Sequence, residues 1–156
     1  MEKKDRILLG DIFCVGIDKT FKSYFQYITR DSTQLSSQVI RVFAHHYPMD
    51  SEPTMEEIVR DKVAFYAHTI IKVGIAYDAW YKVGKSKELG DTQELMFRQN
   101  SSATNWRIWK INTPFVFVGT LSEIEKKYDI GIVLSYMNIC EKIRTGHFLN
   151  EQLRFW

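Results

Sequence analysis

Short runs of β-branched and aromatic residues alternate with polar segments along the first fifty residues, and this pattern predicts a succession of strands. Residues 7–18 (ILLGDIFCVGID) are apolar on both faces, which predicts a buried strand entered by a turn at its Gly-Asp step. Residues 23–31 (SYFQYITRD) predict a second strand. A polar run joins it to a third over residues 39–48, where Pro48 ends the pattern.

Two segments carry helix signals. Thr54 is followed three residues later by Glu57, which fits a capping box, so a short helix is expected near residues 55–60. A longer helix is expected near residues 136–145, with Gly146 as its C-cap. The apolar stripe of this helix consists of Tyr136, Ile139, Cys140 and Ile143.

Residues 62–80 (KVAFYAHTIIKVGIAYDAW) fit either a helix or a strand. Their density of β-branched and aromatic residues favours one long strand, with Gly74 at a bend or bulge. Residues 85–105 are polar and predict a loop. The remaining expected elements are strands over 95–99, 105–112, 115–121 and 130–135, and a helical turn over 122–129 capped by Ser122. Together these elements predict one α+β domain over residues 1–156, with a mostly antiparallel, strongly bent sheet or a small barrel.

Composition agrees with this class. The 156 residues are 45% apolar and 26% charged, as in ordinary globular domains, and the 14% of aromatic residues favours a sheet-rich fold. Cys14 and Cys140 fit free, buried cysteines in a reducing cytosol. The apolar run near the N-terminus is too short for a signal peptide, and no window is long enough to span a membrane. We therefore expect a cytoplasmic protein without a membrane partner.

The net charge of +2 is too small to indicate nucleic acid or membrane binding, but acidic residues gather in one segment. Between residues 50 and 61 a single base, Arg60, accompanies five acids: Asp50, Glu52, Glu56, Glu57 and Asp61. Such a run ordinarily faces water at a helix start. The alternative is an acidic docking edge for a basic partner.

The stretch AWYKVGKS (residues 79–86) differs at its first residue from the phosphate-binding loop Gly-x-x-x-x-Gly-Lys-Ser. A phosphate loop needs small residues that let backbone N–H groups turn inward, whereas Trp80, Tyr81 and Val83 are bulky and β-prone. No parallel βαβ alternation surrounds the stretch, and Gly90 interrupts any helix after it. We interpret it as a strand followed by a turn.

Other catalytic or metal-binding patterns are weak. His45 and His46 are adjacent, so in a strand their rings point to opposite faces, and no metal-ligand spacing includes His68 or His147. Cys14 with His45 or His68 would make a nucleophile and base, but no nucleophile elbow accompanies them. We therefore expect no catalytic residue, metal or cofactor; a site assembled from distant parts of the fold stays open.

The stretch NWRIWK raises a nucleic-acid alternative, because aromatic side chains interleaved with basic ones can stack on and neutralise single-stranded nucleic acid. Trp106 and Trp109 are an odd number of residues apart, so in a strand they face opposite sides, and core packing is the better interpretation. The alternative nucleic-acid surface would consist of Lys82, Lys85, Arg107 and Lys110.

Several stretches resemble a bacterial family, immunity protein 26: the opening LGDIFCVGID and YFQYI, the W-x-x-V-G at Trp80, WRIWKIN and GIVLS. The resemblance covers residues 7–146. It implies a small cytoplasmic protein that protects its producer by binding a cognate toxin domain. Some relatives carry a phosphotriesterase label, but the histidine-rich metal spacing expected for that chemistry is missing here.

The leading hypothesis is thus a non-enzymatic immunity protein that occludes a toxin domain by direct contact, with the acidic segment as its interface. Inhibitors of this kind need aromatic anchors and complementary charge rather than catalytic groups. The alternatives are a small-barrel nucleic-acid-binding module and a hydrolase with a dispersed site near His45, His68 or Asp78. Nucleic acid is not the expected partner, and the sequence does not indicate the oligomeric state.

Overall fold

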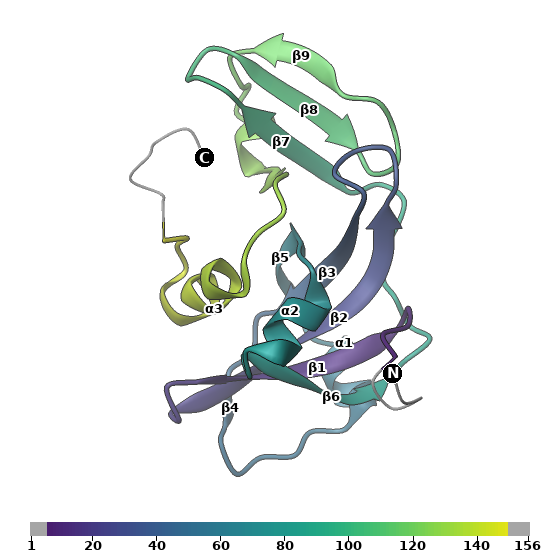
Figure 1. Ribbon diagram of the computed structural model, residues 1–156, viewed down its shortest axis with the longest axis vertical. Coiled ribbons are helices and arrows are strands. Elements are labelled where there is room, and N and C mark those ends of the chain that lie inside the picture. The colour runs from purple at the N-terminus through teal and green to yellow at the C-terminus, as the bar shows by residue number, and fades with distance from the viewer. Residues whose placement is uncertain (1–5, 150–156) are drawn as a thin grey trace.

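The computed structural model describes residues 6–149, which form two sheets and a few short helices (Figure 1). The larger sheet has the order β5-β3-β2-β1-β6, with β4 paired to β2, and all its pairings are antiparallel. Its strands are β1 (Asp11–Ile17), β2 (Phe21–Asp31), β3 (Ser37–Phe43), β4 (Tyr47–Pro48), β5 (Val63–His68) and β6 (Trp80–Lys85). The expected strands at the start of the chain are confirmed with changed bounds: β1 is shorter, β2 begins earlier, and the expected third strand is divided between β3 and β4.

The smaller sheet has the order β10-β7-β8-β9 and is antiparallel except for the pairing of β10 with β7. Its strands are β7 (Met96–Asn100), β8 (Trp106–Lys110), β9 (Val116–Gly119) and β10 (Asp129–Ile130). The predicted α+β class with mostly antiparallel pairing is confirmed. Over the described residues neither sheet closes into a barrel; the strands are divided between two sheets instead.

The local helix signals are confirmed. Helix α1 (Met55–Val59) begins with the capping box, in which the Thr54 side chain accepts from Glu57 N and the Glu57 carboxylate accepts from Thr54 N. Helix α3 (Tyr136–Thr145) ends at Gly146, whose φ of 84° lies in the left-handed region that glycine tolerates. The expected turn capped by Ser122 is the short 3-10 helix η2 (Glu125–Lys127).

The predicted long strand over residues 62–80 is wrong. Strand β5 ends at His68, helix α2 (Ile71–Ala76) follows, and β6 begins at Trp80. The Trp80 indole packs across α2 and its Nε1 donates to Ile71 O at 2.9 Å. A Cβ on Gly74 would lie 2.1 Å from the Trp80 ring, so glycine here admits the indole and marks no bulge. This tertiary packing overrides the local β propensity. The AWYKVGKS stretch is a strand, as predicted, since β6 covers most of it.

The predicted strand over residues 130–135 is also wrong. Only Asp129 and Ile130 pair with β7; the chain then crosses to the larger sheet, where Val133 bridges to His68 and Leu134 N donates to His68 O at 2.8 Å. The segment ties the two sheets together, because its backbone bonds go first to one and then to the other.

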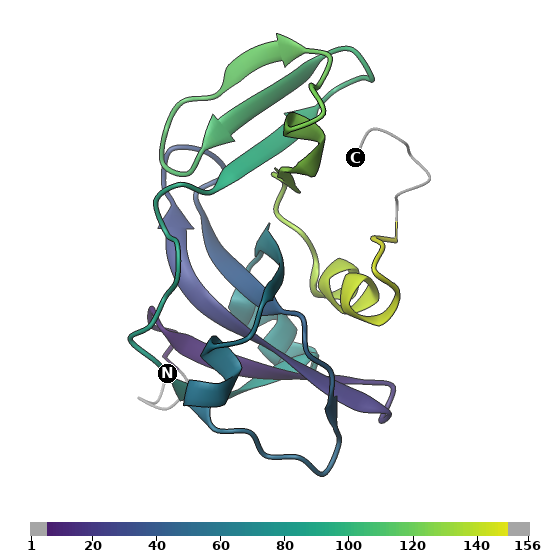
Figure 2. The same ribbon diagram turned by 180° about the vertical axis from the view of Figure 1, so that it is seen from behind.

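The two faces of the larger sheet carry different helices. Phe13, Phe25 and Val42 belong to the core cluster that contains Ile71 of α2 and Ile139 of α3. The opposite face, with Ile12 and Tyr24 among others, packs against Ile58 of α1. Helix α1 therefore lies on the other side of the sheet from α2 and α3, as Figure 2 shows from behind.

Candidate binding surface

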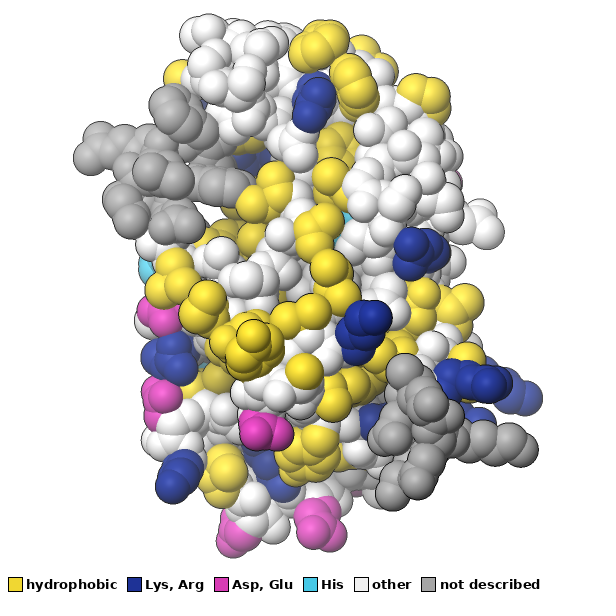
Figure 3. Space-filling model, viewed as in Figure 1, with side chains coloured by type: hydrophobic (Ala, Val, Ile, Leu, Met, Phe, Trp, Pro, Cys, Tyr) yellow, Lys and Arg dark blue, Asp and Glu magenta, His cyan; other side chains and the backbone are white. Residues whose placement is uncertain are grey.

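Apolar side chains gather on the exterior of α2 and at the start of α3, where Figure 3 shows them across the middle of the molecule. Tyr77 is 66% exposed and Met137 is 53% exposed. We call this surface the α2–α3 face; it consists of Ile70, Val73, Ile75, Tyr77, Val133 and Met137, all of them exposed. A patch of large apolar side chains that the chain leaves in water is typical of a protein-binding site.

The composition of α2 explains this face. A helix of six residues can bury only one side, and here that side is Ile71 and Gly74. The exposed positions of α2 carry Lys72, Val73, Ile75 and Ala76, so a single charged side chain accompanies three apolar ones, where a solvated helix would carry more charged residues. Tyr77 extends the face toward α3 by stacking on Tyr136, with ring centroids 5.2 Å apart and an interplanar angle of 12°. The two helices therefore present one surface.

A hollow of about 420 Å³ adjoins this face, lined in part by Ile70, Lys72 and Val133. Arg30 also lines it and donates from its guanidinium to Ser36 O at 2.8 Å. None of the described residues that line the hollow is acidic. Its lining mixes apolar side chains with uncharged polar ones, and its two charged residues, Arg30 and Lys72, are both cationic.

The turn beside this hollow is strained. Leu35 and Ser36 adopt φ values of 64° and 45°, in the left-handed region that disfavours residues with a Cβ. Each such residue costs on the order of 1–3 kcal/mol and persists only where other contacts hold it. The same pair of left-handed residues occurs at Asp18 and Lys19 in the β1–β2 turn, so this conformation belongs to the hairpin and does not by itself mark a binding site.

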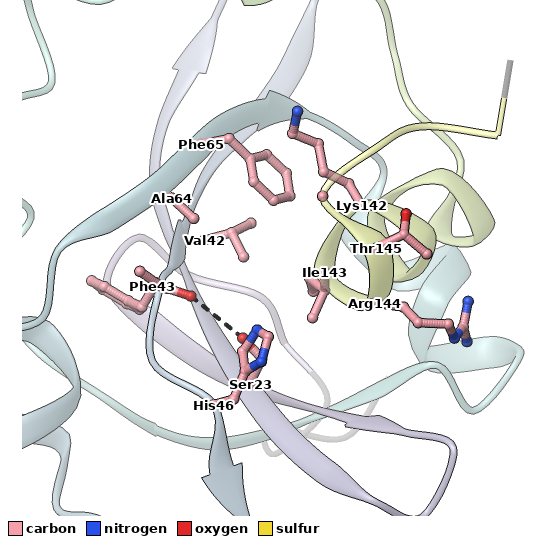
Figure 4. A pocket seen from close by; sticks show the side chains of 12 residues that line it. Ser23, Val42, Phe43, His46, Ala64, Phe65, Lys142, Ile143, Arg144 and Thr145 are labelled. Atoms are coloured by element: carbon pink, nitrogen blue, oxygen red, sulfur yellow. Dashed lines mark hydrogen bonds between the residues drawn. The ribbon is translucent and has the colours of Figure 1, made fainter. Parts of the chain in front are cut away.

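A second hollow, of about 490 Å³, lies between α3 and the larger sheet (Figure 4). Val42 and Phe65 face Ile143 across it, and Ser23 Oγ donates to Phe43 O at 3.4 Å. The bases His46, Lys142 and Arg144 contribute to its lining. This groove is apolar inside and cationic at its rim.

Arg144 at that rim is already engaged. Its Nε donates to Asp18 Oδ2 at 2.7 Å and its Nη1 to Glu141 Oε2 at 2.6 Å. The hydrogen bond from Arg144 lowers the pKa of Asp18. The Arg144–Asp18 pair joins the β1–β2 turn to α3.

The structure gives several of the predicted acidic interface residues local roles. Glu57 completes the capping box, Glu56 pairs with Arg60, and Asp61 Oδ2 accepts from His45 N at 2.7 Å. Asp50 and Glu52 are both exposed on the loop before α1. Since α1 lies opposite α2 and α3, the acidic segment and the α2–α3 face point to different sides of the molecule.

The predicted nucleic-acid residues are not brought together. Lys82 and Lys85 lie on β6 of the larger sheet, whereas Arg107 and Lys110 lie on β8 of the smaller one. Lys82 Nζ is 3.1 Å from Asp11 Oδ1, and Lys110 Nζ is 3.5 Å from Glu94 Oε2. Both tryptophans of the β8 stretch are buried, as the core-packing interpretation predicted.

A histidine–carboxylate pair does occur, but it is buried. His68 Nε2 lies 2.9 Å from Asp31 Oδ2, and the same oxygen accepts from Trp109 Nε1 at 2.9 Å. All three side chains are buried where the two sheets meet. Burial lowers the pKa of His68 more than the nearby Asp31 raises it. The neutral form also fits the geometry. A protonated Nδ1 would need a hydrogen-bond acceptor, and His68 Nδ1 has none among the described residues.

The remaining candidates for a dispersed site lie elsewhere. His45 and Asp78 are exposed, and Cys14 is buried in the cluster beneath α1. Within residues 6–149, no three His, Cys, Asp or Glu side chains are grouped so that they would hold a metal ion.

No helix in the described range is long and apolar enough to cross a membrane. Comparison of the chain with models of known families, with curated proteins and with solved structures gave no match.

Proposed function

We propose that this protein is an immunity-type binding protein that neutralises a cognate toxin domain by direct contact and occlusion, acting in the cytoplasm of the producing cell. The observation that carries the proposal is the α2–α3 face, whose large apolar side chains remain exposed. Burying such side chains against a partner releases about 25 cal/mol per Å² of apolar surface. An inhibitor that acts by occlusion needs this kind of surface and no reactive group.

The face suggests how the partner is held. Tyr77 is the natural anchor, since aromatic side chains supply large contact areas at low conformational cost and often dominate binding energy. Arg30 and Lys72 border the adjoining hollow. They favour a partner whose apolar patch is flanked by carboxylates, because charges at an interface rim mainly steer association and orientation.

The acidic segment remains a rival interface for a basic partner. The two surfaces lie on opposite sides of the larger sheet, so one compact toxin domain would cover one of them and leave the other free. The residues for testing the rival are Asp50 and Glu52. Reversing Glu57 would also remove the helix cap and confuse binding with stability.

The test is calorimetric titration against the C-terminal domain of a large toxin-like protein encoded next to this chain. We expect tight binding with loss of toxin activity. Tyr77→Ala should weaken it at least tenfold, and Asp50→Lys with Glu52→Lys should leave it unchanged. The reverse pattern would move the interface to the acidic segment. If this protein and the toxin-like domain are both folded and no binding is measured, the immunity function against that toxin is refuted.

A further inference from the structure

A small hollow of about 180 Å³ lies between the smaller sheet and α3. Four basic side chains line it, and they come from three elements: Arg98 from β7, Lys126 and Lys127 from η2, and Lys142 from α3. Its described lining contains a single acid, Asp129 of β10. The fold therefore brings together basic residues that are far apart in the sequence.

Two of these basic side chains are held in place by their neighbours. Arg98 is partly buried; its Nε donates to Tyr128 O at 2.9 Å, and its Cζ lies 5.0 Å from the centroid of the Trp106 ring. Lys142 is also partly buried, and its Nζ lies 4.5 Å from the centroid of the Phe148 ring. Because Tyr128 and Phe148 line the hollow themselves, both positive charges lie at its wall. Groups positioned in advance lose little conformational freedom when a ligand binds.

The positive charge of the hollow is only partly balanced. Lys126 pairs with Glu123 at 2.8 Å, but within residues 6–149 no carboxylate forms an ion pair with Lys127 or Lys142. Burial raises the pKa of Asp129, and Lys142 lies close enough to oppose that rise. One acid cannot balance two lysines, so the hollow keeps an excess of positive charge.

We propose that this hollow binds a phosphate group, as inorganic phosphate or as a phosphate monoester. Ammonium and guanidinium groups make strong, charge-assisted hydrogen bonds to phosphate oxygens. A phosphate group carries a charge of about −1.5 to −2 at neutral pH, which matches Lys127 and Lys142 better than the single charge of a carboxylate does. The groove of Figure 4 adjoins the hollow, because Lys142 lines both, and it offers space for the organic part of a monoester.

The bound phosphate would connect two parts of the molecule. Lys142 belongs to α3, which packs on the larger sheet, whereas Arg98 lies on β7 of the smaller sheet. A ligand that binds only the folded chain stabilises it. The proposal does not depend on the toxin-binding function, since the lining shares no residue with the α2–α3 face and binding is measured on this chain alone.

The test is an NMR titration of the isotope-labelled full chain with inorganic phosphate and, separately, with phenyl phosphate, at an ionic strength held constant with sodium chloride. Phosphate should shift the amide signals of Lys127, Asp129 and Lys142, with a dissociation constant on the order of 1 mM. Tighter binding of phenyl phosphate would identify a monoester as the ligand, and weaker or equal binding would identify free phosphate. Either result supports the site.

Three variants test the charges. Lys142→Gln should weaken phosphate binding by about fivefold or more, and Lys142→Arg should largely restore it. Asp129→Asn should tighten binding, because it removes the one acid of the lining while an amide oxygen can still accept from Tyr66 N. The matched control is Lys72→Gln, at an exposed lysine of the other cationic hollow, and it should leave binding unchanged.

Several results would overturn the proposal. One is the absence of any shift with either phosphate compound, and another is a set of shifts that sodium chloride alone reproduces. Shifts confined to the surroundings of Arg30 and Lys72 would also do so, since they would place the anion in the other hollow. If Lys142→Gln does not fold, Asp129→Asn decides: binding that fails to tighten refutes the site.

Discussion

Replacing Asp31 by alanine tests the physical account of how the two sheets are joined. Its fully buried carboxylate ends β2 in the larger sheet and accepts from Trp109 Nε1 of the smaller sheet and from His68 Nε2 of β5, each at 2.9 Å. The other carboxylate oxygen accepts from Asn112 N at 3.2 Å and Gln34 N at 3.4 Å. One side chain therefore satisfies donors from four segments.

The expected loss of stability in Asp31→Ala follows from those hydrogen bonds. Without the carboxylate, the Trp109 indole N–H and the His68 ring N–H stay in the core without an acceptor, at about 1–3 kcal/mol each. The two backbone donors lie nearer the surface, where water can replace the oxygen. With the small cavity left behind, Asp31→Ala should lower the free energy of unfolding by about 3–5 kcal/mol. Asp31→Asn keeps one acceptor oxygen and should lose about half as much.

The assay is urea unfolding followed by tryptophan fluorescence and by circular dichroism. Asp50→Ala is the matched control, because that carboxylate is exposed, and its effect should stay within about 0.5 kcal/mol. A loss below about 1 kcal/mol for Asp31→Ala would refute the reasoning, since buried donors cannot be left unsatisfied so cheaply. Equal losses for Asp31→Ala and Asp50→Ala would do the same.

Three further predictions concern ionisation and packing. Burial raises the pKa of Asp129 to about 6, so at pH 7 the folded state holds an unfavourable charge. Asp129→Asn should therefore stabilise by about 1–3 kcal/mol at pH 7 and by nearly nothing at pH 4, in urea titrations at both values. Burial lowers the pKa of His68, so as the pH falls the unfolded chain binds a proton at this histidine before the folded chain does. The free energy of unfolding should therefore fall as the pH drops below about 6.5. His68→Gln should reduce that slope relative to wild type, and an unchanged slope would assign it to other groups. Gly74→Ala should destabilise by about 1–3 kcal/mol, because its Cβ would overlap the Trp80 ring; a rise in the thermal midpoint would show that α2 can accommodate the methyl group.

The exposed α2–α3 face was not predicted from the sequence because it depends on α2. Ile70, Val73 and Tyr77 are spaced three and four residues apart, which is a helical period, but the β-branched and aromatic density of residues 62–80 favours a strand. A six-residue helix carries too little local signal to decide between the two. Packing of Trp80 on Gly74 decided it, and that contact exists only in the folded chain.

The sequence by itself determined the features whose causes span a few residues. The capping box of α1 and the left-handed cap at Gly146 follow from side chains or backbone freedom within one turn. The strands β1 and β2 follow from short runs of β-branched and aromatic residues. Only the tertiary structure decided the division of the strands into two sheets, the burial of Asp31 with His68, the exposed α2–α3 face and the cationic hollow between the smaller sheet and α3. These depend on which distant segments meet, and contact energies between distant segments outweigh local propensities of a few tenths of a kcal/mol per residue.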